Sequence, residues 1–221
     1  MYNKGCASLE QGDYKAALEY LTAAAEAGDV EAQYRLGMMY RKGEGIEKDV
    51  NKAAPLLFDA AVQGHGIAQY IMGKCYRYGD GVIPNPREAF MWYRAGARSG
   101  YAKSQFATAE CYYQGIGVEQ AAVYYRLAAE QDFTNAQLAL GHCYDQGLGV
   151  DRDEKEAFRL FLKAAKKEDN DYAMFVVGSC YEQAKGVERD VEEARVWYSK
   201  AAKDGYADAL NALHDLDGLM V

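Results

Sequence analysis

Apolar residues recur along the chain at the spacing of amphipathic helices, and glycine-rich segments separate one helical stretch from the next. The segment 32–40, AQYRLGMMY, shows the pattern, because Ala32, Leu36 and Tyr40 are four residues apart and share one helix face. We expect that face to be buried. Gly37, on the same helix, leaves room for a partner helix to pack closely.

Glycine-rich turns end these first helices, since glycine tolerates the left-handed backbone conformation at a helix C-terminus. A second helix should begin four residues after the second glycine of each turn. Residues suited to cap a helix N-terminus recur there, namely Asp49, Asn85, Asp153 and Asp190. Three of them are followed at capping-box spacing by Glu88, Glu156 and Glu193.

This combination of two helices and a turn repeats along the chain. Five tyrosines, each five residues before a turn glycine, mark the repeat: Tyr40, Tyr76, Tyr112, Tyr144 and Tyr181. Their spacings of 36, 36, 32 and 37 residues fit one helical hairpin, and stacked hairpins form a solenoid. We therefore predict an all-α fold of about six hairpins plus a terminal capping helix, with about 12 or 13 helices and no sheet. The expected repeats are 1–30, 31–66, 67–102, 103–134, 135–171 and 172–207, with a cap at 208–221, in a single domain 1–221.

The repeat at 103–134 departs from the pattern, because AAVYYRLAAEQ follows GIGVEQ directly and Ala121 matches Ala89. About four residues are missing where the N-cap and first turn of the second helix should lie. Either the second helix of this repeat is shortened, or a loop has been left out of the sequence as numbered. The pattern leaves both interpretations open.

Composition restricts the partners. With 25 basic and 33 acidic residues, the net charge is −8, and the charges are well mixed. Nucleic acid and anionic membranes need clustered Lys and Arg, so neither is expected as the main partner. No segment approaches the roughly 20 apolar residues of a membrane span, so no direct membrane insertion is expected. The N-terminus lacks the apolar core and cleavage site of a signal peptide, which favours a cytoplasmic location unless a leader has been removed.

Cysteine and histidine offer little chemistry. Cys75, Cys111, Cys143 and Cys180 occupy one slot per repeat without a C-x-x-C pair, so we expect reduced packing thiols and no metal site. None of the three histidines has a serine, cysteine or carboxylate at triad spacing, and the GEG and GDG turns lack the lysine of a phosphate loop. The sequence thus predicts that the protein is not an enzyme and has no cofactor or small-molecule substrate.

The recurring residues L-G, Y, G-x-G-V, D, A, W and A-A resemble the Sel1-like repeat family, a relative of the tetratricopeptide repeat, over nearly the whole chain. The resemblance implies a right-handed α-α superhelix whose first helices line a concave groove, where a peptide or protein partner binds. It therefore implies a scaffold or adaptor. Some secreted, cysteine-rich relatives have β-lactamase or penicillin-binding activity, so a secreted protein of that kind is one alternative. A structural spacer within a longer chain is another.

The candidate groove residues lie on the first helices, either on the face opposite the apolar stripe or at the turn-side edge of that face. They differ between repeats where the stripe recurs, and folding does not dictate their identity. They are Arg35, Met38, Arg41, Lys42, Lys74, Arg77, Tyr78, Glu110, Tyr113, His142, Asp145 and Glu182. Tyr34, Tyr70 and Phe106, near the edge of the stripe, either pack between helices or offer an aromatic platform to a ligand.

Charge along these helix ends changes from Arg41 and Arg77, through Tyr113, to Asp145 and Glu182. This order predicts a groove that is basic toward the N-terminus and acidic toward the C-terminus, with a ligand of complementary polarity. We expect the double substitution Arg41→Glu and Arg77→Glu to abolish binding without lowering the melting temperature.

Overall fold

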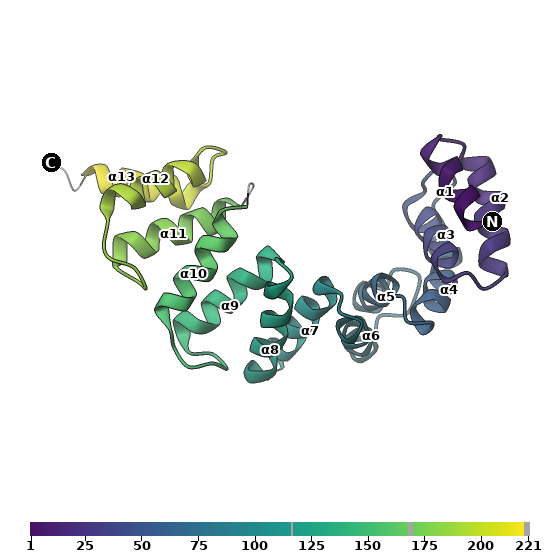
Figure 1. Cartoon of the computed structure of the whole chain (residues 1–221), viewed down its shortest axis with the longest axis horizontal. Coiled ribbons are helices and arrows are strands. Elements are labelled where there is room, and N and C mark those ends of the chain that lie inside the picture. Colours follow the sequence, from purple (N-terminus) through teal and green to yellow (C-terminus); the bar gives the residue numbers. More distant parts are fainter. Residues whose placement is uncertain (116, 168–169, 219–221) are drawn as a thin grey trace. The chain divides into compact units, whose positions relative to one another are not determined.

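The computed structural model describes residues 1–115, 117–167 and 170–218, which contain thirteen helices and no strand (Figure 1). The helices are α1 (Tyr2–Glu10), α2 (Tyr14–Glu26), α3 (Val30–Lys42), α4 (Val50–Val62), α5 (Gly66–Tyr78), α6 (Pro86–Arg98), α7 (Ala102–Gln114), α8 (Val118–Glu130), α9 (Thr134–Gln146), α10 (Glu154–Ala165), α11 (Asp171–Gln183), α12 (Val191–Ala202) and α13 (Ala207–Gly218). The all-α prediction is confirmed. Residues 219–221 of the expected cap lie outside the described range.

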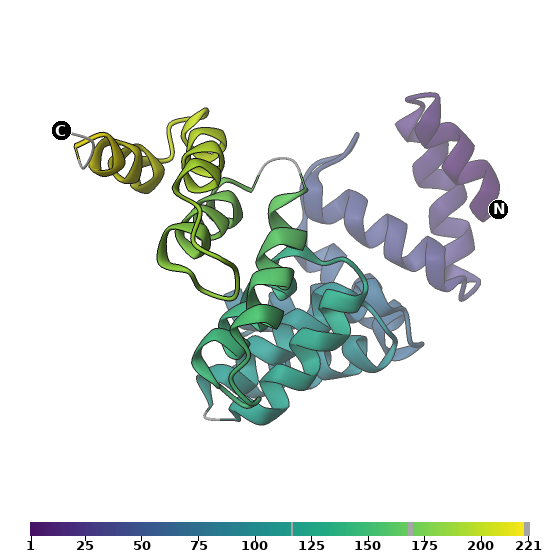
Figure 2. The ribbon, with the colours of Figure 1, turned by 60° about the vertical axis from the view of Figure 1, so that its left-hand side comes forward.

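The chain forms two compact halves, Met1–Thr108 and Ala109–Val221, with the boundary inside α7. Within each half, helices pack as hairpins, and the pairs α3 with α4, α5 with α6, α9 with α10, and α11 with α12 make the most extensive contacts. The second helix of one hairpin also packs against the first helix of the next, as α4 does on α5 and α10 on α11. Figure 2 shows the alternation of helices and loops from a second direction.

In four of the hairpins, a glycine of the first helix packs against a large residue of the second helix. Leu57 packs over Gly37, Tyr93 over Gly73, Phe161 over Gly141 and Tyr198 over Gly178. A Cβ atom on any of these glycines would lie less than 3.0 Å from the nearest side-chain atom. The four large residues are buried. The expectation that Gly37 makes room for a partner helix is therefore confirmed.

The repeat tyrosine is less buried than expected. Tyr40 is half-buried, and its ring packs against the apolar clusters of α2–α3 and α4–α5. The Lys52 ammonium lies 5.5 Å from the centroid of this ring. The expectation that Tyr40 is buried is wrong, because it lies in the last turn of α3, where these clusters cover it only in part.

The two glycines of each turn have different roles. Gly43, Gly79 and Gly147 follow the last residue of a first helix with φ between 70° and 77°, the left-handed conformation that was predicted to end these helices. The second glycine approaches the preceding repeat. A Cβ on Gly81 or Gly149 would lie less than 3.0 Å from a backbone carbonyl oxygen at the start of the preceding second helix.

The predicted N-caps are confirmed. The side chains of Asp49, Asn85, Asp153 and Asp190 each accept two backbone N–H groups from the first turn of the following helix. The predicted capping box is wrong in its second bond, because the backbone N–H of each cap residue donates to the carbonyl of the repeat tyrosine. Asp49 reaches Tyr40 at 2.9 Å, and Asp190 reaches Tyr181 at 3.0 Å. The glutamate is not needed as an acceptor for this N–H.

The short repeat retains a full second helix. α8 has 13 residues, as many as α4 and α6, so the interpretation of a shortened helix is wrong. The missing positions lie in the connection between α7 and α8, residues 115–117, whereas the second, third, fifth and sixth hairpins have seven-residue connections such as 43–49. Gly117 takes the place of the N-cap, and its N–H donates to the Tyr112 carbonyl at 2.7 Å. The bond between cap amide and repeat tyrosine thus survives the deletion.

Candidate functional site

Two of the predicted groove arginines in the N-terminal half are already paired. Arg41 Nε lies 2.8 Å from Asp80 Oδ2, with 23% and 29% of the two side chains exposed. This pair joins the end of α3 to the turn after α5. Arg35 Nε lies 3.3 Å from Glu31 Oε1 on the same helix. The predicted basic character of these helix ends is therefore partly neutralised within the protein.

The other candidates of this half vary in exposure. Lys42 and Arg77 are exposed, Tyr78 is 67% exposed, and Lys74 is half-buried. The Arg77 guanidinium lies 5.6 Å from the centroid of the Tyr78 ring, a cation–π distance. Met38 packs against the apolar cluster of α4 and α5.

The aromatic candidates pack between neighbouring helices. Tyr34 stacks on His65 with ring centroids 4.4 Å apart, and burial raises the pKa of its hydroxyl. Tyr70 lies 5.8 Å from Tyr93 and 5.6 Å from Tyr101, again between ring centroids. Phe106 is half-buried. The geometry at Tyr34 and Tyr70 favours the packing interpretation over a platform for a ligand.

His65 has a structural role that the sequence did not reveal. Its Nδ1 accepts the backbone N–H of Ala68 at 3.1 Å, so this histidine caps the N-terminus of α5. Its Nε2 lies 2.9 Å from Glu31 Oε2. The signal was available, since His65 occupies the position that Asp29, the cap residue of α3, holds one repeat earlier.

In the C-terminal half, the first helices α7, α9 and α11, together with the second helix α8, line a cavity of about 390 Å³. Glu110, Tyr113 and His142 of the candidate set line it, together with Tyr125, Gln146 and Tyr172. The structure thus brings together three predicted residues from two repeats. The sequence analysis missed Tyr125 and Tyr172. Tyr125 lies on the second helix α8, and Tyr172 lies outside the predicted face of the first helix α11.

Hydrogen bonds fix the polar groups of this cavity. The buried Tyr125 hydroxyl donates to the Glu110 carboxylate. Burial, reinforced by this carboxylate, raises the pKa of Tyr125, so its hydroxyl stays protonated. Tyr172 Oη and His142 Nε2 share a hydrogen bond of 3.0 Å. Burial lowers the pKa of His142, with a smaller opposing effect from Asp145, so the imidazole is neutral at neutral pH.

The two remaining acidic candidates contact their own repeats. Glu182 is half-buried and accepts the hydroxyl of Tyr198 at 2.6 Å. Asp145 is also half-buried, and its backbone carbonyl accepts Arg152 Nε at 3.0 Å. The first contact involves the Glu182 carboxylate, whereas the second involves only the backbone of Asp145.

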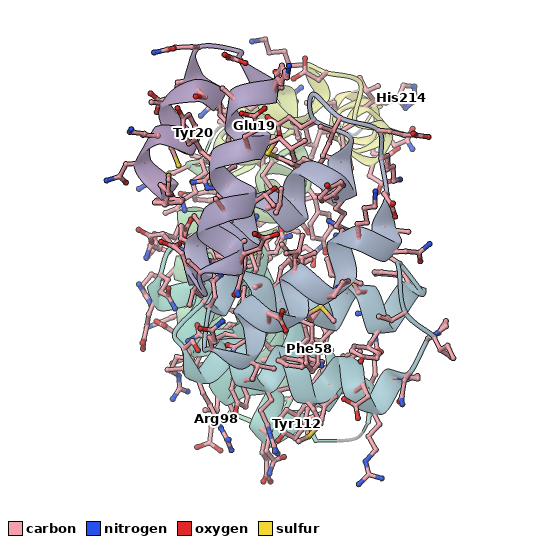
Figure 3. All side chains as sticks on the ribbon, turned by 90° about the vertical axis from the view of Figure 1, so that its right-hand side faces the viewer. Glu19, Tyr20, Phe58, Arg98, Tyr112 and His214 are labelled. Atoms are coloured by element: carbon pink, nitrogen blue, oxygen red, sulfur yellow. The ribbon has the colours of Figure 1, made fainter. Side chains whose placement is uncertain are left out.

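The second helices present a different surface. Phe58 on α4, labelled in Figure 3, is 41% exposed. Its ring meets that of Trp92 edge-on with centroids 5.6 Å apart. Apolar contacts between successive second helices account for this residue.

Nucleophilic and metal chemistry have little support. Cys75, Cys143 and Cys180 are buried free thiols, and burial raises the pKa of each, to about 11 for Cys180. A thiol of this kind is protonated at neutral pH and is a weak nucleophile. Among the described residues, no group of three or more His, Cys, Asp or Glu side chains is arranged to hold a metal ion. None of the described helices combines the length and apolar character needed to span a bilayer.

Comparison with known proteins gives a family match. The family model of the Sel1 repeat matches residues 1–29, 30–65, 66–101, 102–133, 134–169 and 171–206. A search of curated proteins finds no match.

Solved structures include close relatives in fold. A Sel1 repeat protein from Oxalobacter formigenes is 30% identical with a TM-score of 0.88, and the match covers 96% of this chain and 88% of that one. A protective antigen of uropathogenic Escherichia coli, described as displaying an SLR fold, is 32% identical with a TM-score of 0.86, over 90% of this chain and 43% of that one. An immunity protein from Pseudomonas aeruginosa shares the fold at 19% identity and a TM-score of 0.53, over 97% and 82% of the two chains.

Proposed function

Because this chain belongs to the Sel1 repeat family, whose members generally serve as scaffolds for protein–protein interaction, we propose that it is a non-catalytic scaffold that binds a peptide or protein partner on its first helices. The cavity of the C-terminal half carries this proposal. Its aromatic, carboxylate, amide and imidazole groups converge from four helices, as in binding sites generally. Buried reduced thiols accord with the cytoplasmic location that we also propose.

The charge of the two halves indicates the kind of partner. The C-terminal half has 21 acidic and 12 basic residues, a net charge of −9, whereas the N-terminal half has 12 acidic and 13 basic residues, a net charge of +1. The overall acidity of the protein thus comes from one half. We propose that the partner segment at this half is basic, because complementary charge speeds encounter and selects the partner. The same charge disfavours nucleic acid.

The experiment is a comparison of partner capture by matched variants. Tyr113 and Tyr172, each exposed by more than 40%, line the cavity, whereas Val123 and Leu127 are similarly exposed on the second helix α8. Immobilised protein carrying Tyr113→Ala and Tyr172→Ala should lose a partner that the parent captures. A chain carrying Val123→Ala and Leu127→Ala should retain it. Equal capture by both variants, or loss only with the α8 variant, would contradict binding at the cavity.

Enzymatic activity can be tested on the same material. The parent protein should not hydrolyse a chromogenic β-lactam above the buffer rate. Hydrolysis that persists after repeated purification would contradict the proposal of a non-catalytic scaffold.

A further inference from the structure

The cavity of the C-terminal half also indicates which partner side chain enters it. We propose that it binds the guanidinium group of an arginine, with Glu110 as counter-charge and Tyr113 and Tyr172 as stacking surfaces. The inference rests on the proposed function, since it names the group that anchors a basic partner segment.

Glu110 is positioned to meet a cation. It is half-buried on α7, and the buried hydroxyl of Tyr125 donates to its Oε1 atom. An ionised carboxylate offers about four acceptor sites, so one bond from Tyr125 leaves capacity for a second donor pair. A guanidinium presents parallel N–H groups that match a carboxylate in a bidentate pair. The Tyr125 bond therefore orients Glu110 without using its whole acceptor capacity.

The aromatic residues suit a planar cation. Tyr113 is 44% exposed and Tyr172 is 42% exposed, so both rings keep surface that a ligand could cover. Aromatic faces attract cations, and the flat guanidinium stacks on them better than the compact lysine ammonium does. The 3.0 Å hydrogen bond to His142 holds the Tyr172 hydroxyl end in place. This arrangement favours arginine over lysine.

The other groups of the cavity do not oppose a positive charge. Burial keeps His142 neutral, since the lowered pKa disfavours its imidazolium form. Gln146 adds an amide oxygen as a further acceptor. The volume of about 390 Å³ lies in the lower part of the range of ligand pockets, about 300–1,000 Å³, which suits one side chain. A neutral or acidic partner side chain would lack a counter-charge here.

The test is a titration of the full chain, labelled with nitrogen-15, with the capped tripeptide acetyl-Gly-Arg-Gly-amide. Two matched probes replace arginine by citrulline, its neutral isostere, or by lysine. We expect amide shifts in α7 and α9 around the cavity, with arginine binding more tightly than lysine, and citrulline at least about tenfold more weakly, as for loss of a charge-assisted bond.

Glu110→Gln keeps an acceptor for Tyr125 but removes the charge, and it should weaken arginine binding about tenfold or more. The control is Glu119→Gln, which makes the same charge change at an exposed residue of α8 and should leave binding unchanged. Should Glu110→Gln fold poorly, the citrulline comparison on the parent chain decides the question.

Each outcome is decisive. Equal binding of arginine and citrulline, shifts away from the cavity, or no shifts would overturn the arginine assignment, and equal binding of lysine would overturn the stacking argument. If the partner captured by the parent is still lost with the Tyr113 and Tyr172 variant, the proposed function stands while this inference fails.

Discussion

Arg41 and Arg77 occupy the same slot in consecutive repeats, yet their surroundings predict different results when each charge is reversed. Arg41 forms the 2.8 Å pair with Asp80, whereas Arg77 is exposed beside Tyr78. We expect Arg41→Glu to lower the free energy of unfolding of the N-terminal half by about 1–3 kcal/mol. Arg77→Glu should change it by less than about 0.5 kcal/mol. The sequence-based expectation that this pair of substitutions leaves the melting temperature unchanged is therefore replaced.

The magnitude follows from the exposure of the Arg41 pair. Fully exposed ion pairs contribute about 0.2–1 kcal/mol, and hydrogen bonds to charged groups about 1.5–3 kcal/mol. With about a quarter of each side chain exposed, the loss of the Arg41–Asp80 pair should lie between these values. Arg41→Glu also places a second carboxylate beside Asp80. Two like charges about 4 Å apart near a protein surface repel by about 1–4 kcal/mol, and rotation of the new side chain away from Asp80 reduces this repulsion.

The assay is urea unfolding followed by tryptophan fluorescence. Trp92 lies in the N-terminal half and Trp197 in the C-terminal half, so a Trp197→Phe background reports on the N-terminal half alone. Combining Arg41→Glu with Asp80→Arg should restore most of the lost stability, because it re-forms the pair with reversed charges. Equal losses for Arg41→Glu and Arg77→Glu, or no recovery in the swapped pair, would refute the reasoning.

Three further predictions concern the C-terminal half. Gly141→Ala should lower the free energy of unfolding of this half by about 0.5–2 kcal/mol, since overpacking against Phe161 outweighs the gain in helix propensity. Adding Phe161→Leu to the same chain should recover part of the loss in urea midpoint. Folding lowers the pKa of His142, so the neutral imidazole contributes to the free energy of unfolding. This contribution is complete above the unfolded pKa of about 6.5 and is lost as the pH falls through the folded pKa. His142→Phe should remove this part of the pH dependence of the urea midpoint. Asp190→Ala should lower thermal stability by about 1 kcal/mol and Asp190→Asn by much less, and equal melting temperatures for the two variants would contradict a capping role.

Much of the fold could be predicted because its determinants are local and recur. The turn glycines and the cap residues act within a few residues of their own position, so recurrence in sequence was enough to find them. The bond from each cap amide to the repeat tyrosine was not foreseen, since it spans nine residues in the longer turns and five at Gly117, and it uses backbone atoms that carry no residue signature. A recurrent glutamine was missed for a similar reason. Gln33, Gln69, Gln105 and Gln137 are buried, and each donates to a carbonyl eight residues earlier, at the end of the preceding second helix.

The candidate site was harder to predict because variation between repeats has more than one cause. Arg41, which shares its slot with Asp145, pairs with a residue 39 positions away, and no feature of its own repeat reveals that partner. Tyr34 packs on His65, which the preceding repeat replaces with a cap aspartate. Variable positions therefore include residues that join particular neighbours as well as residues left available for a partner.

The cavity shows why comparing equivalent positions is insufficient for finding a site in a repeat protein. Glu110 and His142 share one slot in adjacent repeats, Tyr113 belongs to the slot three residues further along its helix, and Tyr172 lies in the first turn of the next first helix. Comparison slot by slot finds only the first three of these residues. All four residues line one cavity, because stacking brings unlike positions of three successive repeats together. In such folds the specificity of a site depends on which non-equivalent repeat positions the stacking brings together. A substitution at Tyr172 should therefore alter binding at Glu110, although it changes none of the residues that define the repeat.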